Sequence, residues 1–288
     1  STVDDVDYGV THVVRGEDIL PSTPKHILIT EAMGAERASY AHLSLLLGPD
    51  GAKLSKRHGD TAIKAYRDGG FIPEAVVNFL AILGWSPGED EEVVSLADMV
   101  ERFDLEAVSK NPAVFDTTKL EWMNGVYIRE LSHDAFRDRV QSLVEADLGR
   151  ELDASDQLTL EEILPHVQER AKVLTEIPEQ VRFLFGDITY DETSWDKVMR
   201  KEGADVAVAG AAAALTEIGE WSIEAVETAL RGMLATHELS ARKGLQPLRV
   251  AITGSSISPP LFESIAALGR DRTLERLHTA ATRLTDDR

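Results

Sequence analysis

The sequence contains no cysteine, so disulfide bonds and thiolate metal sites are excluded. Its apolar runs fall far short of the roughly 20 residues that a membrane-spanning helix needs. The first residues, Ser-Thr-Val-Asp-Asp, have neither the basic start nor the apolar stretch of a secretory signal. The eight histidines show no i, i+4 pair of the kind that binds zinc, so we expect no zinc site within this chain. From these absences we expect a cytoplasmic protein without a membrane partner.

Positive charge is also scarce, because 30 Lys and Arg residues face 50 Asp and Glu residues, for a net charge of −20. A nucleic-acid-binding protein usually carries a basic surface. The charge is unevenly spread, however: residues 241–288 hold eight basic and five acidic side chains and are +3, which leaves −23 for residues 1–240. Net charge does not exclude a basic stripe on one face. With 288 residues, 43% of them hydrophobic, the chain is long enough for two or three packed units.

Near its start the chain reads as a strand followed by a helix. The alternating segment 10–14 predicts a strand that delivers Arg15 to its C-terminal end. Thr23 then can cap a helix that has Pro24 in its first turn and that ends at Gly34. A strand and a helix with charged residues at their junction are typical of the edge of an α/β nucleotide-binding sheet.

From about residue 61 onward the pattern predicts mostly helices. Pro73 begins one through residue 83, and Ser95 with Asp98 three residues later resembles a capping box for the next. Further helices are expected over 116–125, 132–148, 158–174, from Pro178, over 204–218, over 222–235, and after Pro259 and Gly269. Acidic, polar residues over 187–196 indicate an internal boundary.

The most informative segment is Lys53-Leu54-Ser55-Lys56-Arg57, which lies in a loop between Gly51 and Gly59. Two ammonium groups and a guanidinium on such a loop can close onto a polyphosphate and neutralise charge on leaving pyrophosphate. The alternative for the pentapeptide alone is a solvated basic loop, because short basic runs are common.

In context, the chain resembles bacterial glutamyl-tRNA synthetases over essentially its whole length. Residues 53–57 match that family's form of the class I KMSKS signature. Val13-Val14-Arg15-Gly16-Glu17-Asp18, followed by Ser22-Thr23-Pro24, matches the element lining its amino-acid pocket. Further matches follow in the family's order at 69–75, 78–86, 115–124, 168–174, 247–254 and 258–277.

The resemblance implies a mostly α, overall α+β chain. We expect the end of a Rossmann-type catalytic domain over 1–30 and a mixed stem-contact region over 31–131, which carries the loop 53–57. An all-helical anticodon-binding domain follows, with subdomains over 132–187 and 188–288. No HIGH-type motif precedes residue 53. The chain therefore corresponds to the C-terminal part of the family's pattern, and we expect it to be unable to form glutamyl-adenylate alone.

The activity implied by the resemblance is the attachment of L-glutamate to tRNA(Glu) through a glutamyl-adenylate, with ATP and Mg²⁺, by a monomer. Lys53 and Lys56 would be catalytic and would contact ATP phosphates together with Ser55 and Arg57, while Leu46 would lie against adenine. Arg15 would bind the glutamate carboxylate; the alternative is an ion pair with Glu17 or Asp18.

For the tRNA, the resemblance marks Arg170 as the residue that reads the anticodon, since a guanidinium can pair with or stack on a splayed base. Any exposed helical arginine would look the same. Arg270, Arg272 and Arg276 recur at near-helical spacing and are candidates for backbone phosphate contacts. They could equally pair with Asp271 and Glu275 along a solvated helix.

Two other functions fit parts of the sequence. The first is a tRNA-binding module without catalysis, which the same basic residues allow. The second is an acidic helical protein-interaction scaffold, for which the match at 53–57 would be accidental. The family's truncated relatives that modify a queuosine base are disfavoured, because they lack the helical C-terminal half.

Overall fold

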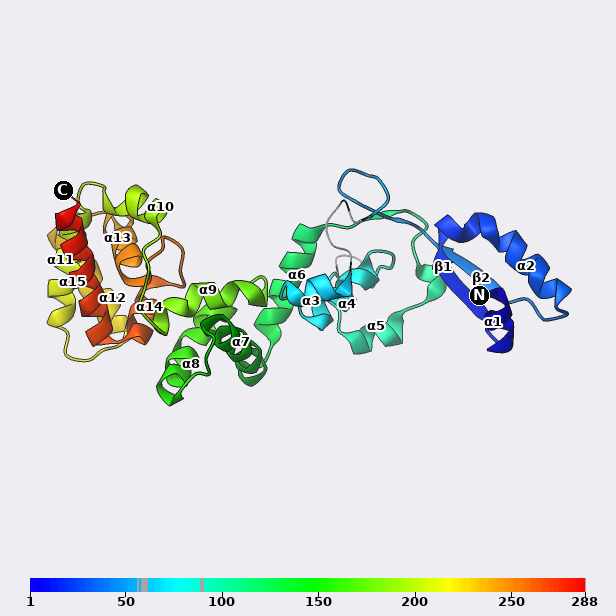
Figure 1. The fold of residues 1–288 in the computed structure, drawn as a ribbon, viewed down its shortest axis with the longest axis horizontal. Coiled ribbons are helices and arrows are strands. Elements are labelled where there is room, and N and C mark those ends of the chain that lie inside the picture. Colours follow the sequence, from blue (N-terminus) through cyan, green and yellow to red (C-terminus); the bar gives the residue numbers. More distant parts are fainter. Residues whose placement is uncertain (56, 58–61, 89–90, 288) are drawn as a thin grey trace. The chain divides into compact units, whose positions relative to one another are not determined.

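The computed structural model describes residues 1–55, 57, 62–88 and 91–287, and it divides into two compact units, Ser1–Tyr127 and Ile128–Arg288. Helices dominate, with a few short strands in the first unit, which confirms the predicted mostly α class (Figure 1). Among the described residues no helix combines the length and apolarity needed to cross a bilayer.

The first unit begins with a strand–helix–strand arrangement. Its elements are α1 (Thr2–Asp7), β1 (His12–Gly16), the 3-10 helix η1 (Glu17–Ser22), α2 (Thr23–Ala32) and β2 (Ser39–Leu43). β1 and β2 pair in parallel, with Arg15 opposite His42. The predicted strand ending near Arg15 and the helix with Pro24 in its first turn are both confirmed. The predicted cap is wrong, because Thr23 is the first residue of α2 and its hydroxyl accepts from Arg15 instead. The helix connection between two parallel strands is the expected βαβ geometry.

The rest of the first unit is built around a small aromatic core. It contains β3 (Leu46–Leu47), α3 (Ile63–Asp68), α4 (Pro73–Ile82), α5 (Leu96–Arg102), η3 (Leu105–Ala107) and β4 (Ala113–Val114), and α6 (Thr117–Glu130) continues past its end. β3 pairs with β4 in parallel. Phe79 and Phe115 meet edge to face at 5.0 Å and pack with Leu120 and Met123. The core therefore joins α4 and α6 beneath β3.

Buried amides fasten this core. Asn124, which is fully buried, accepts from Ile72 N at 2.8 Å through its Oδ1. Asn78 Oδ1 accepts from Val94 N at 2.9 Å and from Tyr127 Oη at 2.8 Å. Because buried polar groups need partners, these bonds fix the connecting segments onto α4 and α6.

The first half of the second unit holds helices α7 (His133–Leu148), α8 (Ala154–Gln168) and α9 (Ile177–Val181), with 3-10 turns η4 (Leu174–Glu176) and η5 (Arg182–Leu184). Ser132 caps α7 as predicted. The predicted helix 158–174 is wrong at its end, because α8 stops at Gln168. Lys172 N bonds to Glu176 Oε1 at 2.7 Å, and Val173 is extended, so the helical ladder cannot continue.

The second half contains α10 (Glu192–Ser194), the π-helix η6 (Trp195–Met199), α11 (Ala204–Thr216), α12 (Ile223–Thr236), α13 (Ala241–Thr253), α14 (Leu261–Leu268) and α15 (Arg270–Asp286). The alanine-rich α11 packs against α12, α13 and α15 (Figure 1). Ala207 and Ala211 are fully buried there. Their small side chains let the neighbouring helices approach closely. The subdomain boundary predicted between residues 187 and 188 stays a prediction.

Candidate functional site

Arg15 lies in β1 with its guanidinium bonded to polar groups of α2 and β2. Nη2 donates to Thr23 Oγ1 at 2.8 Å, and Nε donates to His42 Nε2 at 3.4 Å. Because a guanidinium only donates, His42 Nε2 must accept, which places the ring proton on Nδ1. The alternative pairing of Arg15 with Glu17 or Asp18 is not seen in the described part of the chain. Arg15 is thus held in place by neutral groups.

Lys53 stands at the exit of a tight hairpin. Leu47 and Lys53 form an antiparallel bridge, and Gly48 N donates to Ala52 O at 2.8 Å. Gly51 has φ +74°, a left-handed conformation that suits glycine. Lys53 Nζ donates to Asp18 Oδ2 at 2.7 Å. The structure therefore joins the loop 53–57 to η1, directly after Arg15.

The ion pair with Lys53 changes the titration of Asp18. The hydrogen bond and the charge of Lys53 lower the pKa of Asp18 below its ordinary value of 3.8. A lowered carboxyl pKa means that the pair is present above pH 3.8 and is lost as the pH falls through the lowered value. Lys53 and Asp18 are both exposed, so a polyanion can reach the ammonium.

The other residues of the pentapeptide are placed in part. Leu54 packs against the aromatic core through its side chain, and its N–H bonds to Leu46 O at 2.8 Å. Arg57 Nη2 lies 3.5 Å from Asp50 Oδ2. Ser55 is exposed beside them. Lys56 lies outside the described residues. Leu54 therefore fixes this segment to the core, while the described cations, Lys53 and Arg57, are exposed.

Leu46, the predicted adenine neighbour, lines an apolar pocket of about 520 Å³. The walls come from β1, β2, β3, α4 and the segment 103–113; they include Val14, Leu43, Trp85 and Phe103. A cavity lined mainly by apolar side chains with a few polar groups is typical of small-molecule sites. The pocket stands beside the loop that starts at Lys53, since Leu46 belongs to the strand paired with it.

In the second unit, Arg170 is exposed in the turn just after α8, and not on a helix as predicted. Its charge lies near a second guanidinium, that of Arg249 in α13. Burial lowers the pKa of Arg249, and the neighbouring Arg170 lowers it further. Arg249 Nη1 donates to Pro259 O at 2.7 Å and to Ser258 O at 3.1 Å. The sequence resemblance covered residues 247–254, but it did not reveal that Arg249 lies near Arg170.

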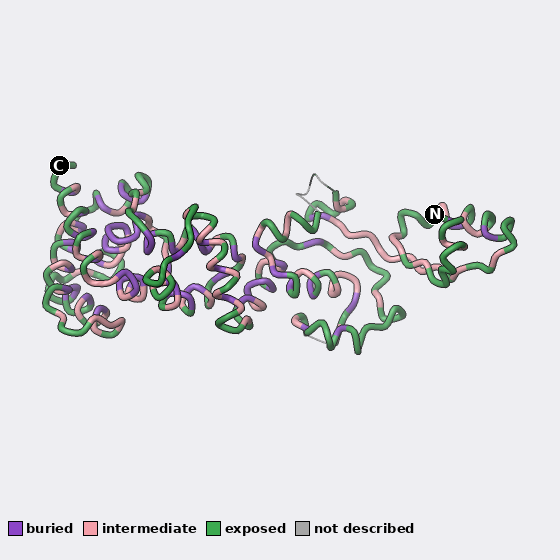
Figure 2. The backbone as a smooth tube through the Cα atoms, turned by 60° about the horizontal axis from the view of Figure 1, so that its bottom comes forward, coloured by how far each residue is buried: buried purple, intermediate pink, exposed green. Residues whose placement is uncertain are grey.

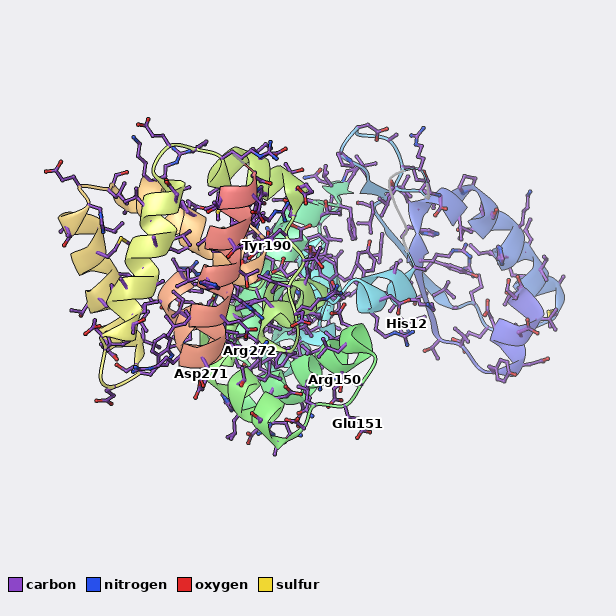
Figure 3. All side chains as sticks on the ribbon, turned by 60° about the vertical axis from the view of Figure 1, so that its left-hand side comes forward. His12, Arg150, Glu151, Tyr190, Asp271 and Arg272 are labelled. Atoms are coloured by element: carbon purple, nitrogen blue, oxygen red, sulfur yellow. The ribbon has the colours of Figure 1, made fainter. Side chains whose placement is uncertain are left out.

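The three arginines at the start of α15 donate to backbone carbonyls. Arg270 Nη2 bonds to Ile218 O at 2.5 Å, and Arg272 Nη1 to Leu184 O at 2.5 Å. Arg276 is only 8% exposed and donates to the carbonyls of Ile252, Phe183 and Gly186 at 2.6–2.8 Å. Figure 3 labels Asp271 and Arg272, where α15 begins.

These contacts favour neither of the two predicted arrangements for Arg276. Burial lowers its pKa to about 10, which leaves it charged at neutral pH while it holds three carbonyls. No ion pair joins Arg270, Arg272 or Arg276 to an acidic residue within 128–287. The placement gives Arg276 a structural role, while phosphate contacts by Arg270 and Arg272 stay predictions.

No group of three His, Asp or Glu side chains suited to a metal ion occurs among the residues that the structure describes.

Each of the two units matches a known protein family. Residues 1–122 match the catalytic domain of class I tRNA synthetases (E and Q), and residues 129–281 match an anticodon binding domain. The glutamate–tRNA ligase of Dehalococcoides mccartyi is 40% identical over 291 residues, covering 99% of this chain. The chain belongs to the glutamate–tRNA ligase family. The resemblance seen in the sequence is thereby confirmed.

Within the glutamate–tRNA ligase family, the chain spans about 60% of the length of the relatives it matches. It covers 60% of the Dehalococcoides ligase and 58% of the Moorella thermoacetica ligase, which is 37% identical over 284 residues. A crystal structure of a glutamate tRNA ligase from Elizabethkingia meningosepticum, in complex with its amino acid, matches with a TM-score of 0.79 and 29% identity. It covers 98% of this chain and 59% of that chain. Sequence and fold therefore agree over both units.

Proposed function

We propose that this chain supplies the phosphate-contacting loop and the tRNA-reading helices of an enzyme that joins L-glutamate to tRNA(Glu) with ATP. The observation that carries the proposal is the order of the two family matches, catalytic over 1–122 and anticodon-binding over 129–281, on two separately packed units. As a member of this family, it would act in the cytoplasm, as a monomer.

In the first step the glutamate carboxylate attacks the α-phosphate of ATP, the bond from the α-phosphorus to the bridging oxygen breaks, and pyrophosphate leaves. Lys53 and Lys56 would stabilise the negative charge that develops on the phosphates. Ser55 and Arg57 would donate to the same oxygens, and Arg57 can do so through two N–H groups. To do this, Lys53 would break its hydrogen bond to the Asp18 carboxylate and donate to a phosphate oxygen instead. Mg²⁺, held chiefly by the phosphates, belongs to the same proposal.

Substrate positioning falls to the residues around β1 and β3. Arg15, bonded to Thr23 and His42, would pair with the carboxylate of glutamate. The backbone beside Leu46, at the wall of the apolar pocket, would receive adenine. Transfer to the terminal adenosine of tRNA follows in the second step.

In the second unit, Arg170 would read the anticodon. Its exposure in a turn gives the guanidinium room to reach a splayed base, which a buried helical position would not. The partly buried guanidinium of Arg249 lies close enough to interact with the charge of Arg170, and Glu263 acts on Arg249 with the opposite sign.

Binding of the chain to a tRNA(Glu) transcript, measured at two salt concentrations, tests the proposal. A second transcript, identical except for altered anticodon bases, serves as the control ligand. We expect saturable binding that weakens with salt and is tighter for the unaltered transcript by about tenfold or more, since a lost base contact costs about 1–3 kcal/mol. Equal affinity for the two transcripts would contradict anticodon reading by this chain.

A further inference from the structure

A second basic site lies in the second unit, in a pocket of about 620 Å³ between η6 and the first turn of α13. Lys197 and Lys201 line it from one side and Arg242 and Lys243 from the other. Glu202 is the one acidic residue of its lining. η6 and α13 pack directly on each other, so the four cations are held by one rigid framework. The pocket therefore concentrates positive charge in a chain whose net charge is −20.

These four cations differ from most other basic side chains of the unit. Six other arginines in 128–287 pair with carboxylates; they are Arg137, Arg150, Arg182, Arg200, Arg231 and Arg283. Over the same described residues, no ion pair or side-chain hydrogen bond engages Lys197, Lys201, Arg242 or Lys243. Like charges brought together repel, and a bound anion would offset that repulsion.

The position of two of these cations adds to the argument. Arg242 and Lys243 occupy the first turn of the 13-residue helix α13, which contains no acidic residue in that turn. The N-terminus of a helix carries partial positive charge, so cations there are disfavoured and anions are favoured. Ser240 caps the helix by accepting from Lys243 N at 3.3 Å, a bond that uses the backbone of Lys243 and not its side chain.

We propose that this pocket binds phosphate groups of the tRNA backbone, at a place distinct from Arg170; the inference rests on the proposed function. The cations are exposed and long, and no buried polar side chain in the lining would orient a particular small molecule. Exposed lysines and arginines bind polyanions through release of counterions, without reading sequence. The pocket therefore contributes affinity and salt dependence, while Arg170 contributes discrimination.

The test compares Lys201→Gln and Lys243→Gln with Arg231→Gln, each of which removes one positive charge from the unit. Arg231 pairs with Glu227 and lies outside the pocket lining. For each pocket variant we expect affinity for tRNA(Glu) to fall roughly five- to tenfold at 0.1 M salt, and the slope of log K against log salt to fall by about 0.7–0.9. The loss should be equal for the transcript with the altered anticodon, and Arg231→Gln should leave the slope unchanged.

Three results would overturn the proposal, and they separate it from the proposed function. If the wild-type chain discriminates between the transcripts but both pocket variants keep its full salt slope, the pocket proposal fails alone. If the pocket variants lose binding of inorganic pyrophosphate while tRNA binding keeps its slope, the pocket is a site for a small anion. If the wild-type chain binds neither transcript, the proposed function fails and the pocket proposal with it. Circular dichroism of each variant confirms that the helices are intact.

Discussion

At the scale of single residues, Lys53 donates to a carboxylate that lies 35 positions earlier in the chain. The sequence predicted the ammonium as a phosphate contact, but it did not predict Asp18 as its partner. Contacts over such separations depend on how η1 and the hairpin before Lys53 meet, which local patterns do not encode. The consequence is a competition, because ATP phosphate and Asp18 would bind the same ammonium.

The pair can be tested by titration. Lys53→Met should raise the pKa of Asp18 toward its ordinary value, because the hydrogen bond from Lys53 is the largest cause of the lowering. NMR of the Asp18 carboxyl carbon over pH 2–6 measures it. Lys64→Met is the matched control: Lys64 lowers the pKa of Asp68, so that variant should move Asp68 and leave Asp18 alone. An Asp18 titration unchanged by Lys53→Met would contradict the pair.

The position of Arg15 in the secondary structure was predicted from the sequence, but its hydrogen-bond partners were not. The alternation over 10–14 correctly placed it near the end of a strand. Its partners, Thr23 and His42, come from α2 and β2, and the parallel register that sets Arg15 opposite His42 forms only in the folded chain. The nearby carboxylates that the sequence offered are not its partners among the described residues.

At the scale of elements, helix starts were predicted better than helix ends. Ser95, Ser132 and Ser222 each cap the helix that follows, as local side-chain-to-backbone bonding requires. Helix α13 was not predicted as a helix, because Gly244 and Pro247 within it are unfavourable to helices. Packing explains Gly244, because a Cβ there would lie 2.0 Å from a Leu234 methyl group. The close contact with Leu234 therefore requires glycine at this position, despite its low helix propensity.

The end of α13 gives a prediction on stability. Gly254 has φ +81°, and a Cβ there would lie 2.5 Å from the carbonyl oxygen of Thr189. Gly254→Ala should lower the free energy of unfolding by about 3 kcal/mol or more, through backbone strain and the clash together. The control is Gly149→Ala at the end of α7, where φ is +67° but nothing lies within 4 Å. It should cost only about 1–2 kcal/mol.

Urea denaturation of both variants, followed by circular dichroism, measures the difference. Equal losses for Gly254→Ala and Gly149→Ala would show that the close approach of residues 189 and 254 does not constrain the protein.

At the scale of the whole molecule, burial is unevenly distributed along the chain. No large apolar side chain is buried among the described residues before Ile72, whereas buried ones recur from there to Leu284 (Figure 2). Leu28 and Ile29 on α2 and Met33 directly after it are 43–65% exposed. Parallel strands are normally covered on both faces, and β1 and β2 form only a two-stranded sheet. The sequence shows that residues 28, 29 and 33 are apolar, but it does not show that their side chains are exposed.

Hydrogen exchange tests this distribution. Local opening is easiest where few apolar contacts are buried, and an isolated two-stranded sheet is marginal in water. Amides of β1 and β2 should therefore exchange on the order of a hundredfold faster than those of α11 and α13. Equal protection of β1 and α11 would contradict the account. Mass spectrometry of peptides spanning 12–43 and 204–253 resolves the two regions.

The proposed reading of the tRNA(Glu) anticodon by Arg170 can be tested with a double cycle. Wild-type and Arg170→Ala chains are each titrated with the unaltered transcript and with one altered in the anticodon. The account predicts that Arg170→Ala weakens binding of the unaltered transcript by about 1–3 kcal/mol and barely affects the altered one, so that discrimination disappears. Weakening of both transcripts by the same factor would contradict it, because a phosphate contact alone behaves in that way.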